Sequence, residues 1–149
     1  MPIISSFAKK LGVCLILLAG PFSFGLPTPL LAYPFATFVL DAATGEKLYG
    51  QNSNTKLHPA SLTKMMTLYL TFREVEEGRL RLDQRVLISK NASREPPSKF
   101  GYKVGQKVSI RFLIRAAAIR SANDAATALG EAISGSEVEF ANYMTRAAR

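Results

Sequence analysis

The sequence His58-Pro-Ala-Ser-Leu-Thr-Lys-Met-Met-Thr67 predicts the start of a helix. From Ser61 onward the apolar residues recur at helical spacing, at Leu62, Met65, Met66, Tyr69, Leu70 and Phe72. This spacing predicts an amphipathic helix with one apolar face. The helix begins after Pro59, and Gly78 is its predicted C-terminal cap.

On the N-terminal side of this helix the pattern is that of a β-hairpin. Residues 35–41 are apolar and β-branched and predict a strand, and residues 46–50 predict the returning strand. Residues 42–45 form the turn between them, and residues 52–54 are a polar loop.

On the C-terminal side, residues 85–89 predict a short strand. Residues 91–105 carry two prolines and two glycines and predict a loop, and loops of this length are often functional. Three helices should follow: residues 110–119 capped by Ser109, residues 123–133, and a last one that starts at a Ser136–Glu139 capping box and runs to Arg149.

Composition narrows the class of protein. The chain has 149 residues, of which 48% are apolar and 20% charged, so it is globular and long enough for one domain or part of one. Cys14 is the only cysteine and His58 the only histidine, so no disulfide can form within the chain and no cysteine or histidine cluster can hold a metal. We expect no metal and no cofactor.

The net charge of +8 is basic, with 19 Lys and Arg against 11 Asp and Glu. A basic surface would favour association with the membrane surface or with cell-wall polymers. The densest basic group, Arg79, Arg81 and Arg85, is interrupted by Asp83, which indicates a mixed, solvated surface instead. No aromatic-basic motif supports nucleic-acid binding.

Residues 1–32 have the pattern of an export signal. Lys9 and Lys10 precede a ten-residue uncharged run, which is short for a membrane span, and prolines follow it. Cleavage after Ala32 would release a secreted chain, although Leu30 is larger than the small residue usual at that position. The alternative is an uncleaved N-terminal anchor.

Ser61 and Lys64 form an S-x-x-K pattern at the start of the predicted helix. Residues three apart share a helix face, so the hydroxyl and the amine can meet, and a desolvated lysine can take the proton from a serine nucleophile. The pattern also occurs at Ser6–Lys9 and Ser53–Lys56, but only Ser61 opens an amphipathic helix. The alternative is that Ser61 is a helix N-cap.

Ser121 and Asn123 form an S-x-N pattern, in which a second hydroxyl can relay a proton and an amide can hold a substrate carbonyl. Ser89-Lys90-Asn91 has the same pattern. The alternative for Ser121 and Asn123 is a loop and N-cap between two helices. His58 precedes Pro59 and has no nearby carboxylate, which favours a packing or loop residue over a catalyst.

Four blocks occur in one order: Asp41-Ala-Ala-Thr-Gly45, His58 to Thr67, Pro96-Pro-Ser-Lys-Phe-Gly101 and Ser121-Ala-Asn-Asp-Ala-Ala126. Together they resemble the D-alanyl-D-alanine carboxypeptidases, the low-molecular-mass penicillin-binding proteins, over nearly all of residues 34–149. The resemblance implies an α+β fold: the N-terminal part of the β-lactamase/transpeptidase-like fold, with a hairpin and a helical subdomain and without the C-terminal sheet strands.

The resemblance also implies a function. It implies a serine peptidase of the bacterial envelope or periplasm that removes the terminal D-Ala from peptidoglycan stem peptides and is acylated by β-lactams. Ser61 would be the nucleophile, Lys64 its general base, Ser121 a proton relay and Asn123 a substrate-binding residue. The main-chain N–H of Ser61 would form half of the oxyanion hole.

The family's third motif, K-T-G or K-S-G on a later strand, does not occur in this sequence. We therefore expect residues 33–149 to be an incomplete serine DD-peptidase catalytic domain, nearly inactive by itself. Two other functions stay open: a serine β-lactamase, and a non-catalytic envelope protein that binds cell-wall peptide. Ser121-Ala-Asn123 and the Pro96 block argue against the β-lactamase.

Overall fold

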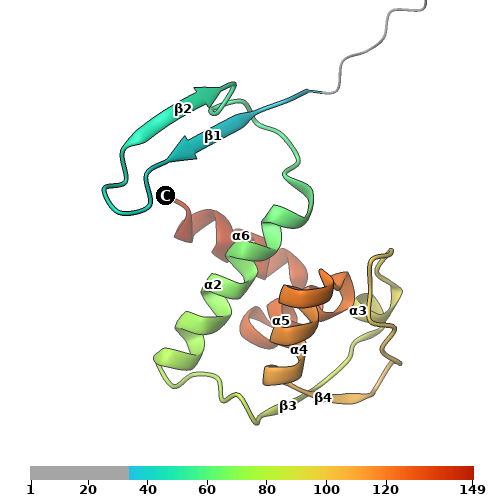
Figure 1. Ribbon diagram of the computed structural model, residues 1–149. Coiled ribbons are helices and arrows are strands. Elements are labelled where there is room, and N and C mark those ends of the chain that lie inside the picture. Colours follow the sequence, from blue (N-terminus) through green and yellow to red (C-terminus); the bar gives the residue numbers. More distant parts are fainter. Residues whose placement is uncertain (1–33) are drawn as a thin grey trace, which may run out of the picture. The chain divides into compact units, whose positions relative to one another are not determined.

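The computed structural model describes residues 34–149, which form two compact units that divide after Thr55 (Figure 1). The predicted export signal, residues 1–32, lies outside the described residues. No helix of residues 34–149 combines the length and the apolar character needed to cross a bilayer.

The first unit is the predicted hairpin. Strand β1 (Thr37–Leu40) pairs antiparallel with β2 (Lys47–Gln51), and Phe38 lies opposite Gly50. Asp41 fixes the turn because its carboxylate accepts hydrogen bonds from the main-chain N–H groups of Ala43 and Thr44, both at 2.8 Å. These bonds hold the pKa of Asp41 below its ordinary value. The hairpin prediction is confirmed.

The second unit begins with a 3-10 turn, η1 (Ala60–Leu62), which continues into helix α2 (Thr63–Glu76). Gly78 follows the end of α2 with φ +72°, a conformation that glycine adopts without steric cost. The predicted helix and its glycine stop are therefore confirmed.

Three longer helices follow in the second unit: α4 (Ile110–Arg120), α5 (Asn123–Ser134) and α6 (Glu137–Ala147). Ser109 caps α4 and Ser136 caps α6, as predicted, each by accepting a hydrogen bond from the main-chain N–H three residues on. The prediction that the last helix runs to Arg149 was wrong, because α6 ends at Ala147.

A second small sheet pairs β3 (Arg85–Leu87) with β4 (Lys107–Ser109), again antiparallel. The segment between them, of which residues 91–105 were predicted to be loop, differs from that prediction. It contains a short helix, α3 (Lys90–Arg94), because the Ser89 hydroxyl accepts from the main-chain N–H of Ala92 and so caps a single turn.

The core of the second unit is built around α4 and α5, whose small side chains allow close packing. Its alanines are Ala92, Ala116, Ala117, Ala122, Ala125 and Ala128. Gly130 of α5 lies so near α6 that an added Cβ would approach a ring carbon of Phe140 to 2.5 Å. Helix α2 packs on the same core (Figure 1).

The face that α2 presents to this core differs from the apolar face seen in its sequence. Thr67, Leu70, Thr71 and Glu74 are buried, whereas Leu62, Met65, Tyr69 and Phe72 are exposed. Thr71 is accommodated because its hydroxyl donates to the Thr67 carbonyl at 2.7 Å. Helical spacing thus predicted the helix, but not the face that packs on the core of the second unit.

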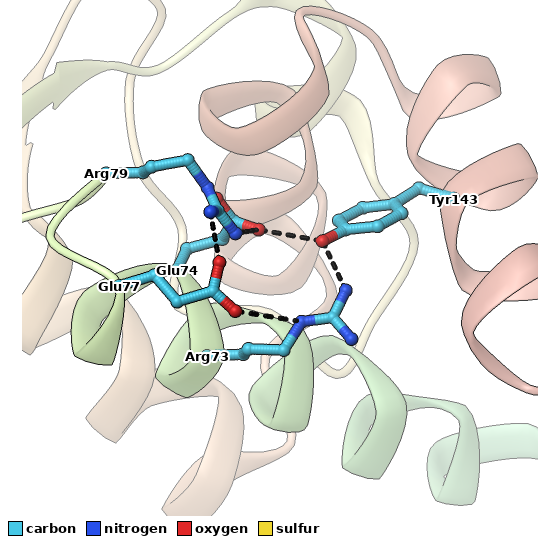
Figure 2. A network of polar contacts seen from close by, with 5 residues as sticks. All are labelled: Arg73, Glu74, Glu77, Arg79 and Tyr143. Atoms are coloured by element: carbon cyan, nitrogen blue, oxygen red, sulfur yellow. Dashed lines mark hydrogen bonds and ion pairs between the residues drawn. The ribbon is translucent and has the colours of Figure 1, made fainter.

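A polar network joins the C-terminal end of α2 to α6 (Figure 2). The carboxylate of Glu74, only 6% exposed, accepts hydrogen bonds from Tyr143 at 2.8 Å and from Arg79, whose Nη2 lies 2.8 Å away. Arg73 donates to the Tyr143 hydroxyl and pairs with Glu77. Hydrogen bonding to the Arg79 guanidinium holds the pKa of Glu74 below its ordinary value, and this effect is larger than the opposing effect of burial.

Glu74→Gln should destabilise the chain by about 1.5–3 kcal/mol at neutral pH, since bonds to a buried charge are lost. A carboxylate whose pKa is lowered by folding contributes stability above its unfolded pKa, and that stability is lost as the pH falls through the folded value. The unfolding free energy of the wild type should therefore fall more steeply below about pH 5 than that of Glu74→Gln. Urea titrations at several pH values test this, and parallel curves would contradict it.

Candidate active site

Ser61 lies in the 3-10 turn that leads into α2. Ala60 before it has φ +49°, a left-handed conformation that is uncommon for a residue other than glycine and is found where the surroundings enforce it. The N-cap position of α2 is Leu62, and no side-chain cap bond is made there or at the start of the 3-10 turn. The interpretation of Ser61 as a helix N-cap was therefore wrong, and its hydroxyl is free for another contact.

That contact is with Ser121. Ser121 ends α4 with φ +54°, and its hydroxyl donates a hydrogen bond to the Ser61 hydroxyl at an Oγ–Oγ distance of 3.0 Å. The two serines are 60 residues apart in the chain. Ser61 directly follows a residue in the left-handed conformation, Ala60, and Ser121 is itself in that conformation. The hydroxyls thus meet at two left-handed turns of the chain.

Lys64 is in the first turn of α2 and is half-buried. Together with Asn123 it lines a cleft of about 330 Å³ whose other walls include Thr67 of α2 and Phe140 and Met144 of α6. Ser61 and Ser121 are not among the lining residues. The Lys64 amine donates no hydrogen bond to any of residues 34–149, so no group in this part of the chain engages it.

Asn123 is the first residue of α5. Its side-chain Nδ2 donates to the Pro96 carbonyl at 2.8 Å, and its main-chain N–H donates to the Ser98 carbonyl at 2.8 Å. The N-cap of α5 is Ala122, and no side chain caps this helix. Asn123 is thus held by the loop that precedes β4, not by a capping role.

Asp124 is a residue of this site to which the sequence analysis gave no role. It is fully buried and accepts hydrogen bonds from main-chain N–H groups of the same loop. Burial, together with the charge of Asp124, raises the pKa of Tyr102 to about 12. The signal was present, because Asp124 follows the S-x-N pattern directly and lies in the first turn of a helix.

The remaining pattern copies differ from these residues. Ser53–Lys56 lies in irregular chain, outside any helix. Ser89 and Asn91 both donate to Glu131, at 2.9 and 3.2 Å, and so fasten α3 to α5. His58 is exposed in irregular chain, which agrees with its interpretation as a loop residue.

Comparison with known proteins decides the family. The family model described as D-alanyl-D-alanine carboxypeptidase matches residues 35–149. The chain belongs to this family. The D-alanyl-D-alanine carboxypeptidase DacF of Bacillus subtilis is 36% identical over 126 residues, which are 84% of this chain and 32% of that protein.

Solved structures agree with this assignment. The D-alanyl-D-alanine carboxypeptidase DacD from Francisella tularensis is 36% identical with a TM-score of 0.72, over 83% of this chain and 30% of that one. Penicillin-binding protein D2 from Listeria monocytogenes in its ampicillin-bound form is 31% identical with a TM-score of 0.64, over 76% of this chain and 44% of that one. The expected fold class is confirmed. The chain spans about a third of the length of the curated D-alanyl-D-alanine carboxypeptidases it matches.

Proposed function

We propose that the protein is a serine-type D-Ala-D-Ala carboxypeptidase that acts on peptidoglycan stem peptides through an acyl-enzyme. The observation that carries this proposal is the 3.0 Å contact between Ser61 and Ser121, in a chain of this family that also has a cleft lined by Lys64 and Asn123. Ser61 of η1 and Ser121 at the end of α4 are in direct contact, and Lys64 of α2 and Asn123 of α5 line one cleft. These are the side-chain types that serine acyl transfer uses.

In the proposed reaction, the Lys64 amine takes the proton of the Ser61 hydroxyl. Ser61 Oγ attacks the carbonyl carbon of the penultimate D-Ala, and the main-chain N–H of Ser61 stabilises the developing oxyanion. Ser121 relays the proton held by Lys64 to the leaving nitrogen, so the peptide bond breaks, D-Ala departs, and Lys64 and Ser121 return to their starting protonation states. Water then hydrolyses the Ser61 ester, and the serine proton is restored.

Asn123 binds the substrate in this proposal. One hydrogen of its Nδ2 group is used by the Pro96 carbonyl, which leaves the second hydrogen to donate to a substrate carbonyl. Residues 1–149 contain no K-T-G or K-S-G tripeptide, so we assign no residue to the second oxyanion donor or to the cation that binds the substrate carboxylate. The ampicillin-bound relative supports the proposal that β-lactams acylate Ser61.

A two-substrate assay on the full-length gene product tests this function. We expect D-Ala release from a peptide that ends in D-Ala-D-Ala, and a long-lived covalent label from a fluorescent penicillin. Rapid hydrolysis of the penicillin without D-Ala release would point to a β-lactamase. Peptide binding with neither reaction would point to a non-catalytic cell-wall-binding protein.

We also propose that the protein acts outside the inner membrane, in the periplasm or envelope, and that residues 1–32 are removed during export. The basic and then apolar pattern of these residues supports this. N-terminal sequencing of the exported protein should begin at Tyr33. Exported material that still begins near Met1 would contradict cleavage and support the anchor interpretation.

A further inference from the structure

The Asp124 carboxylate is fully buried, and it holds one loop by main-chain hydrogen bonds alone. Oδ1 accepts from the N–H of Phe100 at 2.9 Å, and Oδ2 accepts from those of Gly101 and Tyr102 at 2.7 and 3.2 Å. Oδ1 also accepts from the N–H of Ala125 at 2.9 Å. Among residues 34–149, no cation pairs with this carboxylate, and its hydrogen-bond partners are these main-chain N–H groups.

The loop that Asp124 holds, residues 96–102, bonds back to the segment that carries Ser121 and Asn123. The carbonyls of Pro96 and Ser98 accept from the side chain and the main chain of Asn123, each at 2.8 Å. The Ser98 hydroxyl donates to the Arg120 carbonyl at 3.1 Å. This last bond fastens the residue directly before Ser121, whose left-handed backbone needs support from its surroundings.

We propose that Asp124 is a positioning residue, which acts through loop 96–102 to hold the Asn123 amide and the Ser121 hydroxyl in place. The proposal rests on the function proposed above. Asp124 itself touches neither hydroxyl of the serine pair. Its effect reaches the site through the loop carbonyls and the Ser98 hydroxyl.

Asp124→Asn tests the proposal, because it keeps the size of the side chain but turns an N–H₂ group toward N–H donors that need an acceptor. In the full-length protein we expect labelling by a fluorescent penicillin to slow about 10- to 100-fold at a temperature where the variant is folded, since small displacements at a reacting centre cost this much. The matched control is Glu74→Gln, a buried carboxylate changed in the same way outside the site, which should label at the wild-type rate. An unchanged rate in folded Asp124→Asn would overturn the proposal.

Amide hydrogen exchange gives a readout that does not depend on activity. In Asp124→Asn the main-chain N–H of Asn123 should exchange at least about tenfold faster than in the wild type, while those of Leu70 and Thr71 in α2 stay protected. If the wild type is not labelled by penicillin, the proposed function fails, and exchange at Asn123 still decides whether Asp124 holds this segment. An unchanged exchange rate at Asn123 would refute the positioning role of Asp124.

Ser98→Ala decides the point if Asp124→Asn does not fold. Ser98 is exposed, so its loss should leave the melting temperature nearly unchanged, yet it removes the bond from the loop to Arg120. We expect penicillin labelling to slow several-fold in this variant. A labelling rate equal to that of the wild type would show that the loop does not position Ser121.

Discussion

In a protein that includes a K-T-G or K-S-G strand, Ser61→Ala should abolish covalent labelling by a fluorescent penicillin and reduce D-Ala release to background. Without the Ser61 hydroxyl no acyl ester can form at this position. The substitution removes the covalent bond on which the reaction depends, so the effect should be larger than the loss of one stabilising contact. Because Ser61 is exposed and makes no helix-capping bond, alanine should be tolerated by the fold. Circular dichroism and the melting temperature should therefore match those of the wild type.

Two serine variants serve as controls for this result. Ser53 begins the S-x-x-K pattern at Ser53–Lys56, which lies outside the candidate site, so the Ser53→Ala protein should be labelled at the wild-type rate. Ser121→Ala removes the hydroxyl bonded to Ser61 but keeps the proposed nucleophile, so it should label more slowly and at the same final stoichiometry. Persistent labelling of Ser61→Ala, with loss of labelling in one of the controls, would move the nucleophile to that serine.

Lys64→Ala should slow labelling by about two to four orders of magnitude, the usual range for a lost general base. Lys64→Arg separates the base from the charge, because arginine keeps a cation on the same helical turn but stays protonated in proteins. Both variants should be similarly slow when the acylation rate is measured by stopped flow. An arginine variant near the wild-type rate would show that Lys64 acts as a positive charge and not as a base.

The control for the lysine is Lys56→Ala. Lys56 ends the irregular S-x-x-K copy and is exposed, so its removal should leave the acylation rate unchanged. Lys64, in contrast, lines the cleft with Asn123. If Lys56→Ala were as slow as Lys64→Ala, the slow rates would reflect the loss of net positive charge from this chain and not a base at Lys64.

Much of the fold follows from local patterns in the sequence. The hairpin follows from an apolar, β-branched run at residues 35–41 and a returning strand pattern at residues 46–50 around a glycine turn. The helices α2, α4 and α5 follow from apolar spacing and polar caps such as Ser109. These features depend on residues within one turn or one strand pair. The short α3 was not predicted because its single turn depends on the cap at Ser89 inside a segment rich in proline and glycine.

Most of the elements, the family and the residue types of the candidate site follow from the chain alone, because local patterns and the four ordered blocks are properties of the sequence. Only the tertiary structure decided that Ser121 meets Ser61, since that 3.0 Å contact depends on left-handed turns and on helix packing between segments 60 residues apart. It also decided which face of α2 is buried and that Asp124 holds loop 96–102. Long-range hydrogen bonds and the close packing of alanines leave no periodic signal in the sequence, because they depend on how separate elements pack in space.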